Sequence, residues 1–107
     1  MSDNNDPAKR FQELRRQLAH IGFICTGSIL PVYHKCGHPN CACATDKNAL
    51  HGPYLRWTRK VDAKTVTRNL TERQAQMCRE YIQNYRTVEE ILEEMKKLTV
   101  IYLESQK

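Results

Sequence analysis

Apolar residues near the start of the chain recur with the period of a helix. Four of them are separated by 3, 4 and 3 residues and form one apolar stripe. Asp6 followed by Pro7 is typical of a helix start, and Gly22 is typical of a helix end. We therefore predict a helix at residues 6–22. Its stripe consists of Phe11, Leu14, Leu18 and Ile21.

A longer stripe runs through the last third of the chain. Thr71 and Gln74 fit a capping box, and neither proline nor glycine interrupts the residues that follow. We predict a helix at residues 71–105, which at a rise of about 1.5 Å per residue is about 50 Å long. The stripe alternates spacings of 3 and 4, as in a heptad pattern. It comprises Cys78, Tyr81, Tyr85, Val88, Leu92, Met95, Thr99 and Tyr102.

The first predicted helix is about half as long as the second and cannot cover its stripe. The remaining apolar surface needs another copy of the chain or a different partner to bury it. We expect a homodimer, and the pattern leaves the relative orientation of the two helices open. The predicted dimer interface is formed by Tyr81, Tyr85, Val88, Leu92, Met95 and Tyr102.

The middle of the chain has the character of strands and loops. Residues 28–35 are rich in β-branched and aromatic residues, and Pro31 favours an edge position for this strand. Residues 36–53 contain several glycines and prolines and indicate a loop. Residues 54–61 and 64–70 form a hairpin pattern rich in threonine and aromatic residues.

The turn of this hairpin leaves its register open. Asp62 and Ala63 separate the two strand patterns, but a two-residue type I′ turn favours glycine at its second position. A tight turn would place Trp57 opposite Arg68. A longer turn would shift the pairing of the two strands.

The loop carries a cluster of metal-binding residue types. Three thiols and one imidazole within sixteen residues suit a structural zinc site, since three cysteines and one histidine are a common tetrahedral set. His34 and His38 compete for the place of the fourth ligand. Unligated thiols, and an iron–sulfur cluster or redox pair, are the alternatives. The predicted zinc ligands are Cys36, Cys41, Cys43 and His51.

Other chemistry is less well supported by the sequence. Cys25 and Cys78 are each isolated in apolar surroundings, and we expect both to be small core residues. We predict no catalytic residues, because the chain has no phosphate-binding glycine-rich loop and no paired carboxylates near the cysteines. A Cys43 nucleophile assisted by His51 is the alternative, but clustered cysteines are better explained as ligands.

Positive charge is concentrated in the middle of the chain. The formal charge is +5, and the same excess of +5 lies within residues 28–70. A localised basic patch favours a polyanionic partner, most often nucleic acid, although a small sheet can also be solvated by lysine and arginine. The predicted nucleic-acid-binding residues are Arg56, Arg59, Lys60, Lys64 and Arg68.

Length and composition indicate one α+β domain over residues 1–107, with a disordered segment at residues 1–5. The chain is 40% hydrophobic and 27% charged, which is ordinary for a globular protein. The expected architecture is an N-terminal helix, a zinc-stabilised loop, a basic β-hairpin or three-stranded sheet, and a long C-terminal helix. No apolar run suits a membrane span and no signal peptide is evident, so we expect a cytoplasmic protein.

The loop and hairpin also resemble a known family. The run Cys-Gly-His-Pro-Asn-Cys-Ala-Cys, followed by His-Gly-Pro-Tyr-Leu-Arg-Trp, is similar to the signature of small bacterial and phage proteins of unknown function. The resemblance covers nearly the whole chain, and Ala63 departs from it because relatives tend to have glycine there. The shared positions are Cys36, Gly37, Pro39, Cys41, Cys43, His51, Gly52, Pro53, Tyr54 and Trp57.

The resemblance implies that relatives occur near mobile elements, which favours DNA or RNA as the partner. Of the two, we expect DNA rather than RNA. Together with the basic hairpin, it leads us to expect a zinc-containing nucleic-acid-binding protein, such as a DNA-binding regulator or an accessory factor of a mobile element. The alternative is a protein-interaction adaptor or inhibitor that docks through the long C-terminal helix.

Overall fold

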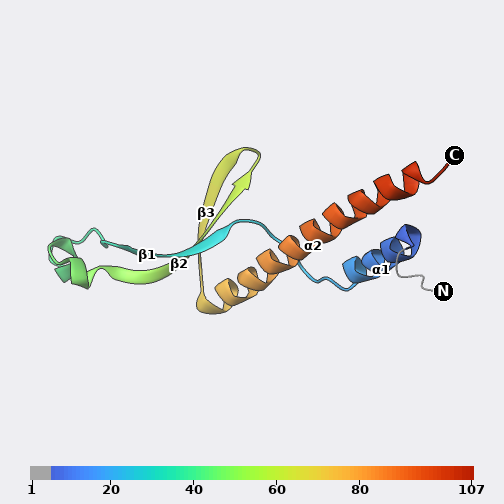
Figure 1. The fold of residues 1–107 in the computed structure, drawn as a ribbon. Helices are drawn as coiled ribbons and strands as arrows, with labels where there is room; N and C mark the ends of the chain where they lie inside the picture. The colour runs from blue at the N-terminus through green and yellow to red at the C-terminus, as the bar shows by residue number, and fades with distance from the viewer. Residues whose placement is uncertain (1–5) are drawn as a thin grey trace. The chain divides into compact units, whose positions relative to one another are not determined.

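The computed structural model describes residues 6–107, which contain two α-helices, three strands and two short 3-10 helices (Figure 1). The predicted α+β fold is confirmed, and of the two predicted alternatives the structure has the three-stranded antiparallel sheet. The prediction for residues 1–5 lies outside the described residues. In chain order the elements are α1 (Pro7–Ala19), β1 (Ser28–His34), η2 (Ala42–Ala44), η3 (Lys47–Ala49), β2 (His51–Val61), β3 (Lys64–Leu70) and α2 (Glu72–Glu104).

The described chain divides into two compact units. The helical unit combines the segment that ends at Ile24 with Gln83–Lys107, and the sheet unit comprises Cys25–Ile82. Within the described residues, no helix is long and apolar enough to cross a membrane.

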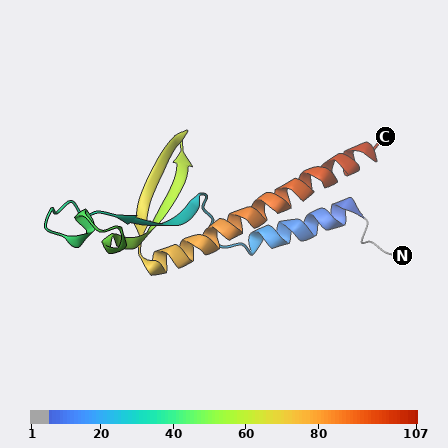
Figure 2. The ribbon, with the colours of Figure 1, turned by 60° about the vertical axis from the view of Figure 1, so that its left-hand side comes forward.

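In the helical unit, α1 lies antiparallel beside the C-terminal part of α2 (Figure 2). Leu14 of α1 and Ile91 of α2 are buried. The other residues of the predicted apolar stripe of α1, Phe11, Leu18 and Ile21, are half-buried. Arg10 joins the two helices through an ion pair with Glu94, at 2.6 Å between Nε and Oε2. As predicted, Asp6 caps α1, and its side chain accepts a hydrogen bond from the Ala8 amide.

Helix α1 ends at Ala19, three residues before the predicted end at Gly22. The amide of the C-cap residue His20 donates to the Gln17 carbonyl and the Ile21 amide donates to the Leu18 carbonyl, which closes the last turn. The side-chain amide of Asn84 then donates to the Phe23 carbonyl at 2.9 Å. This contact explains the early end, because the chain leaves the helix to lie along α2.

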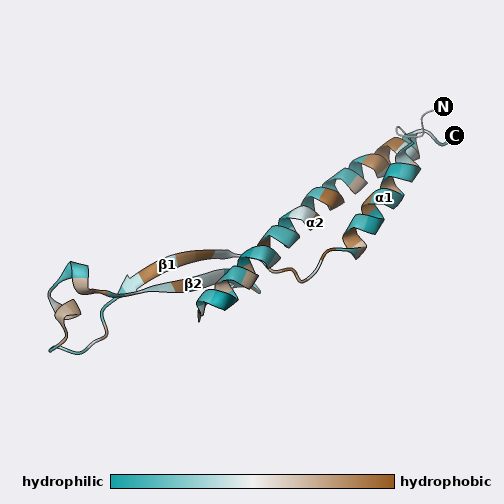
Figure 3. Ribbon diagram, turned by 90° about the horizontal axis from the view of Figure 1, so that it is seen from below, coloured by the Kyte–Doolittle hydropathy of each residue, from teal (hydrophilic) through white to brown (hydrophobic). Residues whose placement is uncertain are grey.

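The C-terminal part of α2 keeps many apolar side chains in solvent. Leu92 is 47% exposed and Leu103 is 68% exposed. Figure 3 shows apolar stretches that continue toward the end of α2, beside α1. Among the described residues, Val100, Ile101 and Tyr102 are also about half exposed. The short α1 thus leaves apolar surface on α2 uncovered, as the lengths of the two predicted helices suggested.

In the sheet unit, the strand order is β1-β2-β3 and both pairings are antiparallel. Pro31 lies on the edge strand β1, as the sequence predicted. The hairpin turn is tight, and Trp57 pairs with Arg68. Asp62 and Ala63 both have positive φ angles, of 50° and 67°, which are those of a type I′ turn. Ala63 therefore adopts a conformation that normally favours glycine.

The register divides the hairpin into two faces. Because side chains alternate along a strand, Trp57 shares a face with Arg59 and with their partners Arg68 and Val66. The opposite face, which we call the threonine face, carries two basic and three hydroxyl side chains beside Asn69. These are Arg56, Lys60, Thr58, Thr65 and Thr67.

Helix α2 begins as the sequence predicts. Thr71 Oγ1 accepts a hydrogen bond from the Gln74 amide at 3.1 Å, and the Thr71 amide donates to Gln74 Oε1 at 2.9 Å. This reciprocal pair is the predicted capping box. Ala75 and Cys78 of the first turns are buried in the sheet unit.

Candidate metal centre

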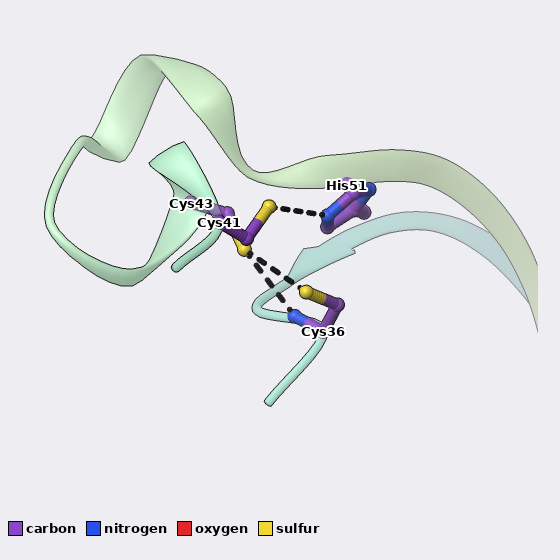
Figure 4. A group of neighbouring side chains, drawn as sticks. All are labelled: Cys36, Cys41, Cys43 and His51. Carbon is purple, nitrogen blue, oxygen red and sulfur yellow. Dashed lines mark hydrogen bonds between the residues drawn. The ribbon is translucent and has the colours of Figure 1, made fainter. Parts of the chain in front are cut away.

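The cysteine loop, residues 35–50, connects β1 to β2 and brings the four predicted ligands together. The ligand atoms of Cys36, Cys41, Cys43 and His51 all lie within 4.8 Å of one another (Figure 4). Cys36 Sγ is 3.5 Å from Cys43 Sγ, and Cys41 Sγ is 3.3 Å from His51 Nε2. The group is therefore compact enough to hold a metal ion.

These separations can be compared with those of a tetrahedral site. With metal–sulfur bonds of about 2.3 Å and metal–nitrogen bonds of about 2.0 Å, neighbouring sulfurs lie about 3.8 Å apart, and sulfur and nitrogen lie about 3.5 Å apart. The two measured distances are within a few tenths of an ångström of these values. Small movements of the side chains would place all four donor atoms around one ion.

Local structure explains how the loop presents its thiols. Cys41 precedes η2, and its amide donates to the His38 carbonyl at 3.1 Å while its own carbonyl accepts from the Ala44 amide. Cys43, within η2, is 1% exposed. The Cys36 amide donates to Cys43 Sγ at 3.4 Å. This hydrogen bond would help to stabilise a thiolate at Cys43, which is the form that binds metal.

His51 enters the site because it is the first residue of β2. It pairs with His34 across the ladder, but the His34 ring stacks on Tyr54 at 4.6 Å between ring centres. Within the described residues, the group close enough to share an ion includes His51 and neither His34 nor His38. The structure thus brings His51, rather than His34 or His38, to the three thiols.

Gly52 holds the two strands close together beside the site. Its φ angle is +133°, and a Cβ atom there would lie 2.6 Å from the Val32 carbonyl oxygen of β1. Only glycine accommodates both the backbone conformation and this approach. Gly52 therefore supports the position of the adjacent ligand, His51.

The environment shifts the pKa values of Cys41 and Cys43 in opposite directions. The backbone N–H of Cys43, and then the His51 ring, lower the pKa of Cys41 to about 6. The Cys36 amide lowers the pKa of Cys43, but burial and the neighbouring thiols outweigh it and raise that pKa above its usual value. A thiolate is thus already favoured at Cys41, whereas a bound cation would be needed to favour one at the buried Cys43.

The predicted nucleic-acid-binding residues are divided between the two faces of the hairpin. Arg56 and Lys60 lie on the threonine face, and Arg56 Nε donates to Asn69 Oδ1 at 3.4 Å. Arg59 lies on the other face, with its guanidinium 4.1 Å from the centre of the Trp57 ring. Lys64 and Arg68 are exposed on that same face.

Arg59 is less available to a ligand than its neighbours. Its Nη1 atom is buried and has no hydrogen-bond partner among the described residues. Its guanidinium stacks on the ring of Trp57, whose Nε1 donates to the Thr26 carbonyl at 2.8 Å. The structure thus places Arg59 in the packing of the sheet unit.

The structure also brings together two cysteines that the sequence reasoning treated separately. Cys25 and Cys78 have their Sγ atoms 3.6 Å apart. Both belong to the sheet unit, although they are 53 positions apart in the chain. No spacing signal could have paired them, because their contact depends on how the segment before β1 packs on α2.

Comparison with known proteins agrees with the expected family. The model of a family described as a domain of unknown function (DUF6788) matches residues 5–80. The chain therefore belongs to this family, whose matched region includes the cysteine loop and the whole sheet. No match was found among curated proteins or among solved structures.

Proposed function

We propose that this chain is a zinc-stabilised nucleic-acid-binding protein that contacts its partner through the threonine face of the hairpin. The observation that carries the proposal is the register, which groups Arg56 and Lys60 with three threonines on one face. Cations and hydroxyl groups are the usual partners of phosphate oxygens. A two-stranded ribbon also fits the major groove of DNA.

The donor set supports zinc as the ion. Three thiolates and an imidazole are ligands that zinc favours, and four protein ligands leave no coordination position for a substrate. The ion would then serve a structural role. It would stabilise the cysteine loop, where Cys43 is the one residue buried among positions 35–50.

Charge on the hairpin supports a nucleic acid over a neutral partner. Between Tyr54 and Arg68 there are five basic residues and one acidic residue, Asp62. The first candidate is DNA, in line with the expectation from the family resemblance that relatives occur near mobile elements. Phosphate contacts of this kind would position a regulator or an accessory factor of such an element on the DNA.

We also propose a homodimer through the exposed side of α2. A groove of about 480 Å³ in the helical unit is lined by Phe11 and by residues of α2, including Leu92. Glu89 and Lys96 lie on either side of Leu92 along this groove. An antiparallel second copy would therefore place Glu89 against the partner's Lys96 while burying Leu92.

Binding of a fluorescent random-sequence duplex at two salt concentrations tests the function. We expect affinity to fall steeply with salt, and R56Q/K60Q to weaken binding and flatten the salt dependence by about two charges per chain. The control R86Q/K97Q removes the same charge from the helical unit and should bind like the unmodified chain. Unchanged binding by R56Q/K60Q would contradict the proposal.

The second candidate function is protein docking through α2, which the exposed Val100, Ile101 and Leu103 favour. It predicts no nucleic-acid binding at physiological salt. Absence of any mobility shift with duplex or single strands would favour this alternative.

A further inference from the structure

The sheet unit contains a pair of thiols outside the candidate metal centre. Cys25 lies in the segment before β1, and Cys78 lies in the second turn of α2. Their Sγ atoms are 3.6 Å apart, and the Cys25 thiol donates to the Cys78 carbonyl at 3.7 Å. The Cys25 amide also donates to the Tyr81 carbonyl at 3.2 Å. Backbone and side-chain contacts together hold the two thiols beside each other.

A small reagent can reach this pair. A cavity of about 280 Å³ lies between β2, β3 and the start of α2, and both sulfur-bearing residues line it. Cys25 is half-buried, whereas Cys78 is only 6% exposed. The remaining lining residues are Trp57, Arg68, Leu70, Gln74, Met77 and Tyr81. Cys25 is therefore the more accessible thiol, with Cys78 behind it.

We propose that Cys25 and Cys78 form a redox-active dithiol that a low-molecular-weight disulfide converts to an intramolecular disulfide. A disulfide bond needs a sulfur–sulfur distance of about 2.05 Å, so the two sulfurs must approach by about 1.5 Å. A rotation of either side chain supplies movement of this size. The proposal does not depend on zinc or on nucleic-acid binding, because neither thiol belongs to the group of four ligands.

The reaction is a pair of thiol–disulfide exchanges. The Cys25 thiolate attacks one sulfur of the small disulfide, breaks its S–S bond and expels one small thiolate, which takes up a proton. Cys78 then loses its proton and attacks Cys25 Sγ in the mixed disulfide, which releases the second small thiol. Two protein thiols are oxidised, and the small disulfide is reduced to two thiols.

The environment of Cys78 is consistent with this order. Burial, together with the adjacent Cys25, raises the pKa of Cys78 to about 11. The positive charges of Arg59 and Arg79 act in the opposite direction but do not offset the burial. Cys78 is thus a poor first nucleophile. It becomes effective only when the mixed disulfide at Cys25 is held within reach.

The bond would enclose the functional part of the chain. The loop closed between positions 25 and 78 contains all three strands and the four candidate ligands. It would also fix the segment that enters β1 to the start of α2. Oxidation would therefore restrict the sheet unit without altering either proposed binding surface.

Peptide mapping of the full chain, loaded with zinc and treated with oxidised glutathione, tests the proposal. We expect a cross-linked peptide pair containing Cys25 and Cys78, while the thiols of Cys36, Cys41 and Cys43 remain protected. Two variants report the order of the steps. C78A should accumulate a glutathione adduct at Cys25, whereas C25A should react at Cys78 at least tenfold more slowly.

The mapping of the unmodified chain needs no variant, so a folding defect in C25A or C78A cannot obscure the answer. Recovery of both thiols in alkylated form after treatment would overturn the proposal. Cross-links from Cys25 or Cys78 to the cysteine loop, or to a second chain, would overturn it as well. Failure of nucleic-acid binding in the same preparation would leave it untouched.

Discussion

The guanidinium of Arg59 lies 4.1 Å from the centre of the Trp57 ring, two positions away on the same face of β2. This cation–π contact separates Arg59 from Arg56, which lies on the threonine face beside Asn69. The two arginines have the same charge and neighbouring positions, but they should have different roles. One packs in the sheet unit, and the other is available to a phosphate.

R59Q should therefore lower the stability of the chain. Loss of the contact with the ring costs about 0.5–1 kcal/mol, and the emission of Trp57, the one tryptophan in the chain, should shift. Urea unfolding followed by tryptophan fluorescence measures both effects. R56Q serves as the control and should change the free energy of unfolding by less than about 0.5 kcal/mol. Equal losses of stability in R59Q and R56Q would contradict the different roles of the two arginines.

Replacement of Ala63 by glycine should stabilise the hairpin. The left-handed conformation at φ 67° is unfavourable for alanine, whereas glycine adopts it freely. After allowance for the greater entropy of glycine in the unfolded chain, we expect a gain of about 0.5–1 kcal/mol for A63G. A63V should lose stability because a β-branched residue tolerates this conformation poorly. Thermal unfolding of both variants checks the prediction, and a loss of stability in A63G would refute it.

The ion pair between Arg10 and Glu94 should contribute little at neutral pH. Both side chains are more than a third exposed, so solvent screens the pair and E94Q should lower the stability only slightly. The Arg10 hydrogen bond lowers the pKa of Glu94 below the usual carboxylate value. Glu94 therefore contributes to the free energy of unfolding at pH values above its pKa in the unfolded chain. This contribution is lost as the pH falls through its lower pKa in the folded chain. Urea unfolding at pH 7 and at pH 3 gives the free energy of unfolding of E94Q and of the unmodified chain. The difference between the two should be smaller at pH 3.

Substitution of Leu92 should disrupt self-association. L92E introduces a charge at the centre of the groove on α2, where a second copy would bury the leucine. We expect the unmodified chain to sediment as a dimer and L92E to sediment as a monomer. V61E makes the same kind of change at another exposed apolar residue, in the hairpin, and should remain dimeric. A monomeric unmodified chain would exclude the proposed dimer.

Much of the helical and strand content was predictable because its signals are local. The Asp6 cap, the capping box at Thr71 and the strand pattern of residues 64–70 depend on near neighbours in the chain. The end of α1 was predicted too late because its position depends on the contact between Asn84 and Phe23, which are 61 positions apart. The register of the hairpin could not be predicted, because alanine disfavours the positive φ angle that a tight turn requires at Ala63. Pairing along the whole β2–β3 ladder outweighs this conformational preference.

The candidate ligands were predictable for a similar reason. Three cysteines and His51 lie close together in a loop that contains few other residues able to form a core. The choice of His51 over His34 depended on geometry, because the His34 ring stacks on Tyr54. The pairing of Cys25 with Cys78 also required the fold. These two cases depend on contacts between distant segments, which residue spacing does not encode.

Zinc binding by Cys36, Cys41, Cys43 and His51 can be measured by native mass spectrometry of the purified chain. We expect one zinc ion per chain, its loss in C43A and its retention in C25A, which removes a cysteine outside the group of four. A folded chain without metal, or zinc retained in C43A, would contradict this expectation.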